Sequence, residues 1–388
     1  MSETREGAAE RQAPHAEERY AEELAFLALQ DPGPRPPGWR LTPRAVVTFV
    51  VGSGGEALKL PRDAAAPPGA PRGLEISEKF VGDRALVERC AVTLAGERGL
   101  LLVGEPGTAK SMLSELLAAA VCGTSALAVQ GTAGTTEEQL RYGWNYALLL
   151  ARGPAPEALV PSPVLSAMRR GAIARVEEIT RCLPEVQDAL VSILSDRRLA
   201  VPELPGDGGV EAARKGFNVI ATANLRDRGV SEMSAALKRR FNFETVPPIA
   251  DVQREVALVR ERARAALAEV GATLQVDDAV LDALVTAFRD LREGRTAEGW
   301  AVEKPGSVMS TAEAVAVASS LGLQAAYFTS DRDPASLVPG YLLGVVLKDD
   351  PKDRGRLLAY WDGTVKRRAE SGARLWKRLL ELRAVLES

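Results

Sequence analysis

The sequence has little of the chemistry on which many enzymes depend. Its only histidine, His15, lies in a polar N-terminal stretch, so histidine-based acid–base catalysis is excluded. Its three cysteines, Cys90, Cys122 and Cys182, follow neither a disulfide framework nor the spacing of zinc ligands. We therefore expect buried free thiols, as in a reducing cytoplasm, and no cysteine metal site.

Long apolar runs and a strong charge imbalance are also missing. Runs such as residues 100–103 and 148–151 are far shorter than the ~20 residues that span a membrane, and the polar, acidic first residues contain no signal-peptide core. We expect a cytoplasmic protein without membrane contact. The net charge of −3 disfavours a nucleic-acid partner, because surfaces that follow phosphates are generally basic. The length of 388 residues, 46% hydrophobic and 26% charged, allows two or three globular domains.

What the chain does have is a glycine-containing loop. Its residues match the phosphate-binding pattern G-x-x-x-x-G-K-[ST] except at the sixth position, where Ala replaces Gly: Gly104, Glu105, Pro106, Gly107, Thr108, Ala109, Lys110 and Ser111. An apolar strand is predicted at residues 100–103 and a helix at 112–121. In this context backbone N–H groups can bind the β- and γ-phosphates, Lys110 adds positive charge, and the Ser111 hydroxyl can ligate Mg²⁺. We expect Ala109 to adopt the right-handed helical conformation, which tolerates its methyl group. A Gly-Pro turn before a lysine-bearing helix is the alternative.

Further polar groups follow in the order that phosphoryl transfer requires. A predicted strand ends at Glu177 and Glu178, of which one can hold Mg²⁺ through water and the next can polarise the attacking water. A later strand ends at Asn224, which could orient that water, and Lys238-Arg239-Arg240 is the kind of cluster that supplies an arginine finger. Singly, these residues are explained as a helix cap, a turn residue and a charged face. Their order along the ends of parallel strands favours a catalytic site.

Together these motifs resemble the AAA+ ATPases, and within them the MoxR group of the branch with an insert in the second helix. The loop is similar to that group's loop, including the Ala before the Lys, and the resemblance covers about residues 74–321. The other similar segments are Val176-Glu177-Glu178-Ile179 at the strand end, residues 219–224 as the sensor-1 strand, Arg240-Phe241 as the finger, and Phe80-Val81-Gly82 near the adenine.

The resemblance implies ATP and Mg²⁺ as cofactors and assigns roles to these residues. Val81, Gly82 and the eight loop residues would bind the nucleotide, Ser111 and Glu177 the metal, and Glu178, Asn224 and Arg240 would be catalytic. Arg239 is the alternative finger.

The sequence also departs from the group in two places. Glu177 stands where the group usually has Asp, and Ser310-Thr311-Ala312-Glu313 stands where it tends to carry the sensor-2 Ser-Pro-Arg, for which Lys304 is a weak substitute. Arg175, inside an otherwise apolar strand, has no explanation from the sequence.

The fold class expected is α/β: an AAA+ P-loop core with a five-stranded parallel sheet covered by helices, followed by an α-helical lid domain. Strands are predicted at residues 100–103, 127–130, 173–176, 219–222 and 243–246. We expect a disordered or loosely helical arm at 1–40, an N-terminal helix and Pro-rich linker at 41–73, the AAA+ nucleotide-binding domain at 74–248, and the lid with C-terminal helices at 249–388.

Two inserts are expected in the core. Residues 131–163 carry the aromatic residues Tyr142, Trp144 and Tyr146 between glycines, which could line a pore and grip a client or could fill a core. By resemblance, this is the second-helix insert, which faces the ring centre. A hairpin pairing residues 198–201 with 217–220 around a turn at 206–209 is expected before sensor 1.

The leading functional prediction is a homo-oligomeric ring, a hexamer, that uses ATP for chaperone-like remodelling or activation of a protein partner. The resemblance implies a von Willebrand factor A protein, which must be a separate chain because this one has no Asp-x-Ser-x-Ser motif. The alternatives are a nucleic-acid-associated AAA+ motor and a nucleotide-binding scaffold with weak hydrolysis, which Glu177 and the missing sensor-2 arginine favour. A small-molecule kinase or a GTPase fits less well, since the chain has no Asn-Lys-x-Asp motif.

Overall fold

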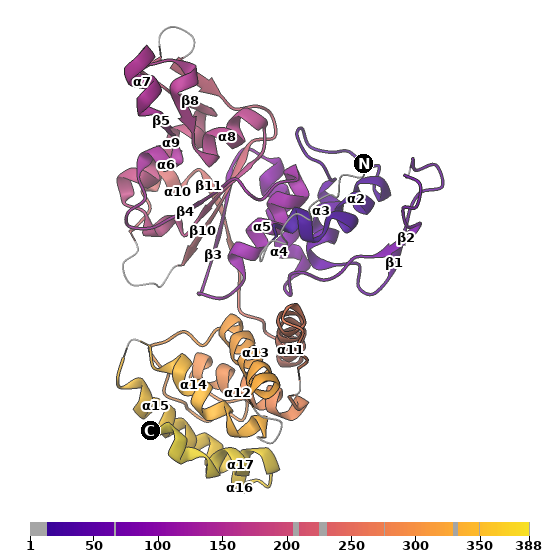
Figure 1. Cartoon of the computed structure of the whole chain (residues 1–388), viewed down its shortest axis with the longest axis vertical. Coiled ribbons are helices and arrows are strands. Elements are labelled where there is room, and N and C mark those ends of the chain that lie inside the picture. Colours follow the sequence, from indigo (N-terminus) through magenta and orange to yellow (C-terminus); the bar gives the residue numbers. More distant parts are fainter. Residues whose placement is uncertain are drawn as a thin grey trace, which may run out of the picture. The chain divides into compact units, whose positions relative to one another are not determined.

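The chain folds into two compact units, seen in the computed structural model (Figure 1). The structure describes residues 14–65, 67–204, 209–224, 231–274, 276–328, 333–348 and 350–387. The first unit contains the described residues up to Gly104 together with Ala109–Val246, and the second contains Glu105–Thr108 and the described residues from Pro247 onward. Each unit has its own buried hydrophobic core.

A five-stranded parallel sheet forms the centre of the first unit, in the order β11-β3-β10-β7-β4. Its strands are β3 (Gly99–Gly104), β4 (Ala128–Gln130), β7 (Ile173–Glu177), β10 (Asn218–Asn224) and β11 (Phe241–Thr245). All five predicted strands are confirmed, although β11 begins two residues before its predicted start. The inner strands are buried along nearly their whole length, as expected for parallel strands covered on both faces.

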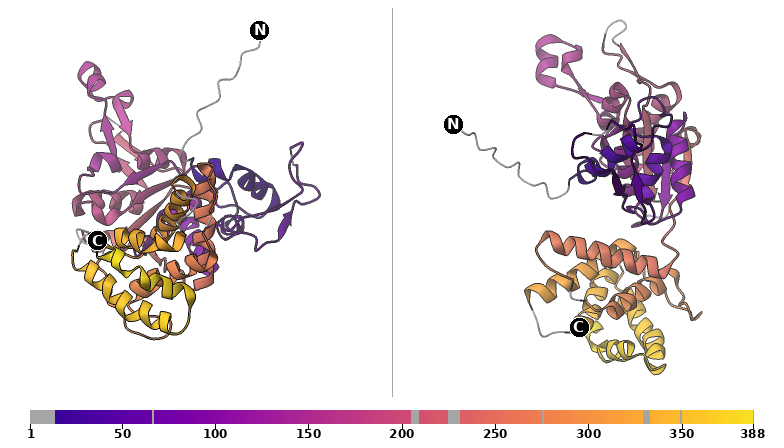
Figure 2. Two further views of the ribbon diagram at one scale, coloured as in Figure 1. Left: turned by 60° about the horizontal axis from the view of Figure 1, so that its bottom comes forward. Right: turned by 90° about the vertical axis from the view of Figure 1, so that its right-hand side faces the viewer.

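Helices cover both faces of this sheet, and β3 shows why. Successive side chains of a strand point to opposite faces. Leu100 and Leu102 belong to one core cluster, with α3 (Pro43–Val51), α4 (Arg84–Ala95) and α5 (Lys110–Cys122). Leu101 and Val103 belong to the other, with α8 (Pro163–Arg170) and α9 (Pro184–Asp196). The sheet is therefore the middle layer of a three-layer unit, as Figure 2 also shows.

The segment before this core is more ordered than the expected disordered or loosely helical arm. Its described part forms α1 (Ala16–Arg19) and α2 (Ala21–Gln30), and Phe26 and Leu27 of α2 are only 3% and 1% exposed. The Arg19 guanidinium also pairs with Glu115 of α5 at 2.9 Å. These contacts attach the segment to the core. The helix expected from residue 41 is α3, which Thr42 caps; a short antiparallel pair, β1 (Ala57–Lys59) and β2 (Gly73–Glu75), follows.

The segment expected to be the second-helix insert, residues 131–163, contains an antiparallel pair of strands with a helix between them. It contains α6 (Glu137–Leu140), β5 (Tyr142–Trp144), α7 (Tyr146–Arg152), η1 (Pro156–Ala158) and β6 (Leu159–Pro161). Tyr142 is buried and donates to Glu203 at 2.8 Å, and burial together with that hydrogen bond raises the pKa of Tyr142 to about 12. In contrast, α7 buries no residue, and its Tyr146 and Leu150 are 64% and 89% exposed. Tyr142 therefore fills a core, as the second of the two expectations has it, whereas Tyr146 is exposed and a pore-lining role stays a prediction.

The predicted hairpin before the sensor-1 strand has the wrong second strand. β8 (Arg198–Ala200) pairs with β9 (Val210–Ala212), whereas residues 218–220 belong to β10 of the central sheet. The physical reason is burial: β10 is buried at every position and suits a central strand, while β8 and β9 are exposed at their ends and suit a surface hairpin. Of the expected turn at residues 206–209, positions 206–208 lie outside the described residues.

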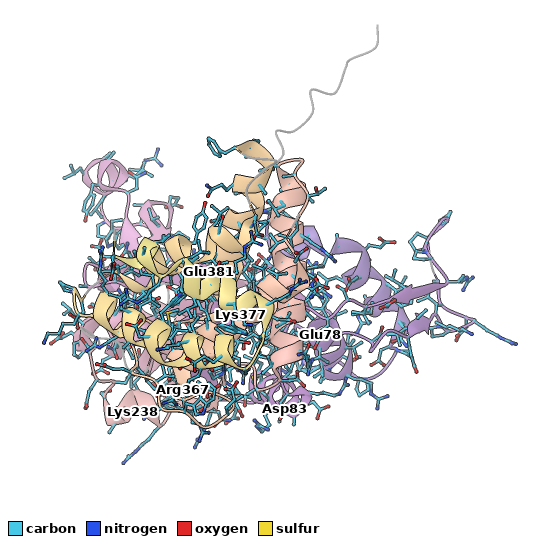
Figure 3. All side chains as sticks on the ribbon, turned by 90° about the horizontal axis from the view of Figure 1, so that it is seen from below. Glu78, Asp83, Lys238, Arg367, Lys377 and Glu381 are labelled. Atoms are coloured by element: carbon cyan, nitrogen blue, oxygen red, sulfur yellow. The ribbon has the colours of Figure 1, made fainter. Side chains whose placement is uncertain are left out.

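The second unit is helical, as predicted. Its helices are α11 (Val252–Glu269), α12 (Asp278–Glu293), α13 (Thr311–Tyr327), η4 (Pro334–Ser336), α14 (Val338–Val346), α15 (Asp353–Tyr360), the π-helical segment η5 (Trp361–Val365), α16 (Lys366–Glu370), α17 (Arg374–Glu381) and η6 (Arg383–Leu386). Buried ion pairs join them: the fully buried Glu255 contacts Arg289 and Arg292, each at 3.0 Å. Charged side chains such as Arg367 and Lys377 line the C-terminal helices (Figure 3). Within the described ranges, no helix has the length and apolar character to cross a bilayer.

Candidate functional site

The candidate phosphate-binding loop joins β3 to α5. Gly104 ends the strand and Lys110 begins the helix. The Lys110 side chain is 7% exposed, and its Nζ donates to the Gly104 carbonyl oxygen at 3.1 Å, so the ammonium group folds back over the loop. The Thr108 hydroxyl donates to the Glu105 carbonyl oxygen at 2.9 Å. A lysine charge therefore lies beside the N-terminus of a 13-residue helix, an arrangement that attracts anions.

The expected conformation of Ala109 is wrong. Its φ of 64° and ψ of 24° lie in the left-handed region, not in the right-handed helical region. The chain reverses direction here between loop and helix, and glycine adopts this conformation without a steric penalty from a Cβ atom. For alanine the same conformation costs roughly 1–2 kcal/mol. The methyl group is thus accommodated at a cost in backbone energy.

Glu177 ends β7 and meets the first turn of α5. Its Oε2 accepts hydrogen bonds of 2.8 Å from both the Ser111 and Thr222 hydroxyls, and its Oε1 accepts one from Ser114. Burial raises the pKa of Glu177, but the charge of Arg175 and these three hydroxyls outweigh it and hold the pKa below its ordinary value. The two residues predicted to bind a metal, Ser111 and Glu177, are therefore in direct contact, with the carboxylate ionised.

Arg175, for which the sequence offered no explanation, is the cation that pairs with Glu177. Its Nη2 lies 2.8 Å from Oε1 of Glu177, and both side chains are buried. Residues two apart in a strand point to the same face, so this spacing was the signal in the sequence that could have identified the pair. Ser114, three residues after Ser111 in α5, and Thr222, two before Asn224 in β10, were also missed. Nothing in their residue types distinguishes them from ordinary core hydroxyls.

Glu178 follows in a strained conformation. Its φ of 52° is in the left-handed region, and its N–H donates to the Thr222 hydroxyl at 2.9 Å. Its carboxylate pairs with Arg181 at 2.7 Å. Close by, the Gly131 N–H donates to the Glu177 carbonyl oxygen at 2.7 Å, and a Cβ at Gly131 would lie 2.5 Å from the Glu178 carbonyl oxygen. Strain of this kind often marks functional sites.

The structure also places Asn224 beside the loop. Asn224 is buried at the end of β10, and it is the register partner of Gly104 in β3. Val81 and Gly82 precede α4, and a Cβ at Gly82 would overlap the ring of the buried Phe80. Glycine at this position therefore lets the aromatic ring pack.

Arg240, the predicted finger, contacts other elements. Its Nε donates to the Ser195 hydroxyl of α9 at 2.7 Å, and its Nη1 donates to the Ala236 carbonyl oxygen of α10 (Ala235–Lys238) at 3.0 Å. Arg239 is exposed. Within one chain, Arg240 is thus held on the surface of α9 and α10 rather than beside Lys110.

The segment at the predicted sensor-2 position starts a helix. Ser310 caps α13 by accepting from the Glu313 N–H at 3.3 Å, and the Glu313 carboxylate accepts from the Ser310 N–H at 3.0 Å. This capping box explains these two residue types as helix-start signals. The aliphatic part of Lys304 lies against Gly294.

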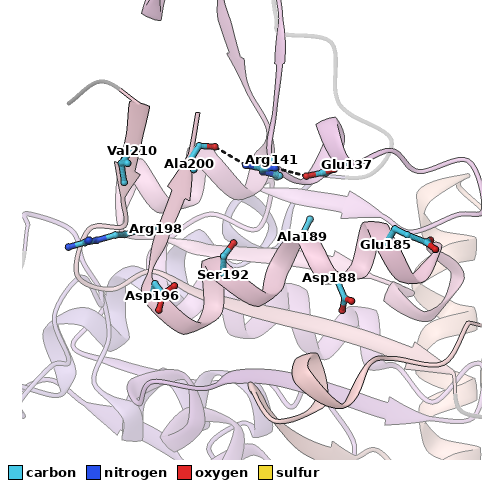
Figure 4. Close-up of a pocket in the computed structure, with 10 residues that line it drawn as sticks. All are labelled: Glu137, Arg141, Glu185, Asp188, Ala189, Ser192, Asp196, Arg198, Ala200 and Val210. Carbon is cyan, nitrogen blue, oxygen red and sulfur yellow. Dashed lines mark hydrogen bonds and ion pairs between the residues drawn. The ribbon is translucent and has the colours of Figure 1, made fainter. Parts of the chain in front are cut away.

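A separate groove of about 540 Å³ lies between α6, α9 and the β8–β9 hairpin (Figure 4). Arg141 crosses its edge, donating to Glu137 and, at 2.7 Å, to the Ala200 carbonyl oxygen. Acidic residues outnumber basic ones in its lining: Glu137, Glu185, Asp188 and Asp196 against Arg141 and Arg198. None of the predicted nucleotide-binding residues lines this groove, so it is distinct from the loop site.

Family comparisons agree with this geometry. An AAA domain model of the dynein-related subfamily matches residues 99–241, and a model of the YehL-like AAA+ ATPase C-terminal domain matches residues 253–387. YehL of Escherichia coli (strain K12) is 49% identical over 365 residues, which are 93% of this chain and 94% of that protein. The chain belongs to the YehL-like AAA+ ATPases.

Other matches are more distant from this YehL-like chain. The protein SH1500 of Staphylococcus haemolyticus (strain JCSC1435) is 32% identical over 196 residues, which are 50% of this chain and 68% of that protein. Among solved structures, NtrX from Brucella abortus in complex with ATP has 15% identity and a TM-score of 0.47, covering 79% of this chain and 69% of NtrX. Apart from Glu105–Thr108, the AAA domain match lies in the sheet-containing unit, and the YehL-like domain match lies in the helical one.

Proposed function

We propose that this YehL-like protein is an ATP-hydrolysing ATPase of the MoxR type, which works as a hexameric ring and remodels or activates a protein partner. The observation that carries the proposal is the contact between Ser111 and Glu177. A hydroxyl at the start of α5 lies 2.8 Å from an ionised carboxylate at the end of β7, next to the buried Lys110. This is the combination of groups that phosphoryl transfer uses.

The residues present fit ATP and Mg²⁺. The loop from Gly104 to Ser111 would bind the phosphates, and Val81 and Gly82 would lie near the adenine. The Ser111 hydroxyl donates a hydrogen bond to Glu177, so the lone pairs of its oxygen remain available to a cation. Within the described residues, no cluster of three His, Cys, Asp or Glu side chains could hold a metal alone. In nucleotide sites Mg²⁺ takes one or two protein oxygens together with phosphates and water, and it neutralises phosphate charge.

The hydrolytic roles follow from the strand ends. Glu178 would polarise the attacking water, its backbone fixed by the hydrogen bond to Thr222, and Asn224 would orient that water beside Gly104. Arg240 would act on the nucleotide of the neighbouring subunit, because its own chain holds it on α9 and α10. Such an arginine in trans makes hydrolysis depend on assembly.

A protein client is favoured over a nucleic acid. The helix α7 exposes Tyr146 and Leu150, apolar surface of the kind that protein partners cover, and the net charge is −3. A von Willebrand factor A partner would be a separate chain. The second candidate is a nucleotide-binding scaffold with weak hydrolysis. Two features favour it: Glu177 is one methylene longer than the Asp that the group usually has, and a capping box stands at the predicted sensor-2 position in place of an arginine.

Subunit mixing tests the shared site. The Arg240→Ala protein keeps an intact loop and both carboxylates, and the Glu178→Gln protein keeps an intact finger. Each variant alone should lose ATPase activity. For Glu178→Gln the loss should be at least ~100-fold, as expected when general-base help is removed. Mixed rings should recover activity, since some interfaces then combine an intact site with an intact finger. Arg239→Ala is the matched control and should keep activity.

The result that refutes the shared site is wild-type turnover by Arg240→Ala alone, or no recovery in mixtures that demonstrably co-assemble. Tight ATP binding by the wild type with turnover near that of Glu178→Gln would instead select the scaffold. DNA-dependent stimulation of turnover would select the nucleic-acid motor.

A further inference from the structure

Arg175 makes more contacts than neutralising one carboxylate requires. Its Nε donates to the Ser114 hydroxyl at 2.9 Å, its Nη1 to the Ser125 carbonyl oxygen at 3.0 Å, and its Nη2 to the Ser111 carbonyl oxygen at 3.1 Å as well as to Glu177. All three guanidinium nitrogens are thus fixed, and the residue is 9% exposed. A buried charge of this kind is costly to desolvate, and replacing such a pair by apolar residues is often neutral or stabilising. Stability alone does not explain it.

The two oxygens of Glu177 have different partners. Oε1 receives the Arg175 guanidinium and the Ser114 hydroxyl, whereas Oε2 receives the Ser111 and Thr222 hydroxyls. The Arg175 guanidinium therefore contacts the carboxylate oxygen that does not accept from the Ser111 hydroxyl. A glutamate has one more side-chain torsion than an aspartate, so without this contact its carboxylate has more ways to turn.

We propose that Arg175 is a positioning residue for the metal site: it holds Oε1 of Glu177 and the Ser111 carbonyl oxygen, so that Oε2 stays on the Ser111 hydroxyl. The proposal rests on the proposed nucleotide and Mg²⁺ site. Arg175 itself touches neither; it acts through Glu177 and the first turn of α5. Partners that orient a metal ligand typically contribute 10–100-fold to metal affinity.

The test measures how Mg²⁺ tightens nucleotide binding, by titrating a fluorescent ATP analogue in EDTA and at increasing Mg²⁺. Arg175→Met should raise the Mg²⁺ concentration for half-maximal tightening at least ~10-fold, with affinity in EDTA unchanged. Arg169→Met is the matched control, because Arg169 also pairs with a glutamate in the same unit, Glu211. It should leave the Mg²⁺ dependence unchanged.

Two further variants separate positioning from folding. Arg175→Lys keeps the charge but not the three-nitrogen geometry, and should fold with a Mg²⁺ shift of the same direction. In Arg175→Met/Glu177→Asp the acidic side chain has one torsion fewer, so its carboxylate has fewer orientations to choose from. The Mg²⁺ shift of this double variant should therefore be smaller than that of Arg175→Met alone. Thermal unfolding of each variant is measured to check that the fold is retained.

The outcomes distinguish the two proposals. If the wild type binds nucleotide without any effect of Mg²⁺, the proposed metal site fails and the inference fails with it. If the wild type shows the effect and a folded Arg175→Met or Arg175→Lys protein has the same Mg²⁺ dependence, the positioning role alone is overturned. A double variant as impaired as Arg175→Met refutes the part of the argument that concerns the longer side chain.

Discussion

Replacing Ala109 by glycine should behave unlike other alanine-to-glycine changes in this chain. In the left-handed region alanine costs roughly 1–2 kcal/mol, which Ala109→Gly removes. Against this gain, glycine loses more conformational entropy on folding, which lowers stability by roughly 0.5–1 kcal/mol. Removing the half-buried methyl group lowers stability by at most about 0.8 kcal/mol more. The sum lies between a loss of about 0.8 kcal/mol and a gain of about 1.5 kcal/mol, with its centre on the stabilising side. We therefore expect Ala109→Gly to be less destabilising than an alanine-to-glycine change inside a regular helix.

Ala189→Gly is the matched control, because Ala189 is also half-buried in the first unit but lies inside the regular helix α9. There glycine relieves no strain and should cost about 1 kcal/mol. For units of about this size, 1 kcal/mol shifts the melting temperature by about 2–4 °C. Thermal unfolding followed by circular dichroism should show Ala189→Gly melting lower than the wild type and Ala109→Gly melting above Ala189→Gly, close to the wild type.

An Ala109→Gly protein that melts as low as Ala189→Gly would refute the reasoning, because it would mean that Ala109 is not held in the left-handed region. The variant also bears on function. Since glycine is the residue that the phosphate-binding pattern has at this position, nucleotide affinity should stay within a few-fold of the wild type.

Three further predictions concern charged groups. Lys110→Ala should weaken binding of a fluorescent ATP analogue at least ~30-fold, as when one partner of a buried charge contact is removed, and an affinity near the wild type would reject the loop assignment. The pKa of Glu177 lies below its ordinary value of 4.5, so its ionised contacts stabilise the fold fully above about pH 4.5 and are lost as the pH falls through the lowered pKa. Glu177→Gln should therefore lose less stability than the wild type on acidification below that pH, and parallel acid unfolding curves would count against it. Arg368→Met leaves the buried Asp290, 2.7 Å away, without its cation and should lower the stability of the second unit by about 3–5 kcal/mol. Arg378→Met is the control: it removes an ion pair that is half-exposed and should lower stability by less than about 1 kcal/mol. Equal melting temperatures of the two variants would contradict this prediction.

Local patterns were enough to predict the sheet. Each strand is a short apolar run bounded by turn residues, and the parallel arrangement places polar residues at one edge. That is why the sequence alone predicts Asn224 at a strand end of the ligand-binding edge, whereas its position opposite Gly104 comes from the register in the structure. The assignment of catalytic roles to Glu178, Asn224 and Arg240 stays a prediction.

Contacts between distant residues could not be predicted from local patterns. Which strand pairs with β8 depends on which later strand enters the central sheet. The exposed ends of β9 identify it as the surface strand, but that exposure cannot be read from the sequence. Phe26 and Leu27 lie in an Ala- and Glu-rich stretch that resembles a loose arm in composition, yet they are buried. The sequence showed Arg175 as an isolated charge because the groups that pair with it come from α5 and from the loop after α5 as well as from its own strand.

Thr222 explains how the separate parts of the candidate site are kept together. Its hydroxyl donates to Glu177 and accepts from the Glu178 N–H, so one side chain of β10 fixes both neighbouring acids. Two residues later the same strand ends at Asn224, beside Gly104. The predicted metal-side acid, water-side acid and water-orienting amide are thus all attached to one buried strand. By contrast, the exposed helix α7 and the β8–β9 hairpin lie on connections outside the sheet. These two segments are therefore separate from the sheet whose strands carry the predicted acids and amide.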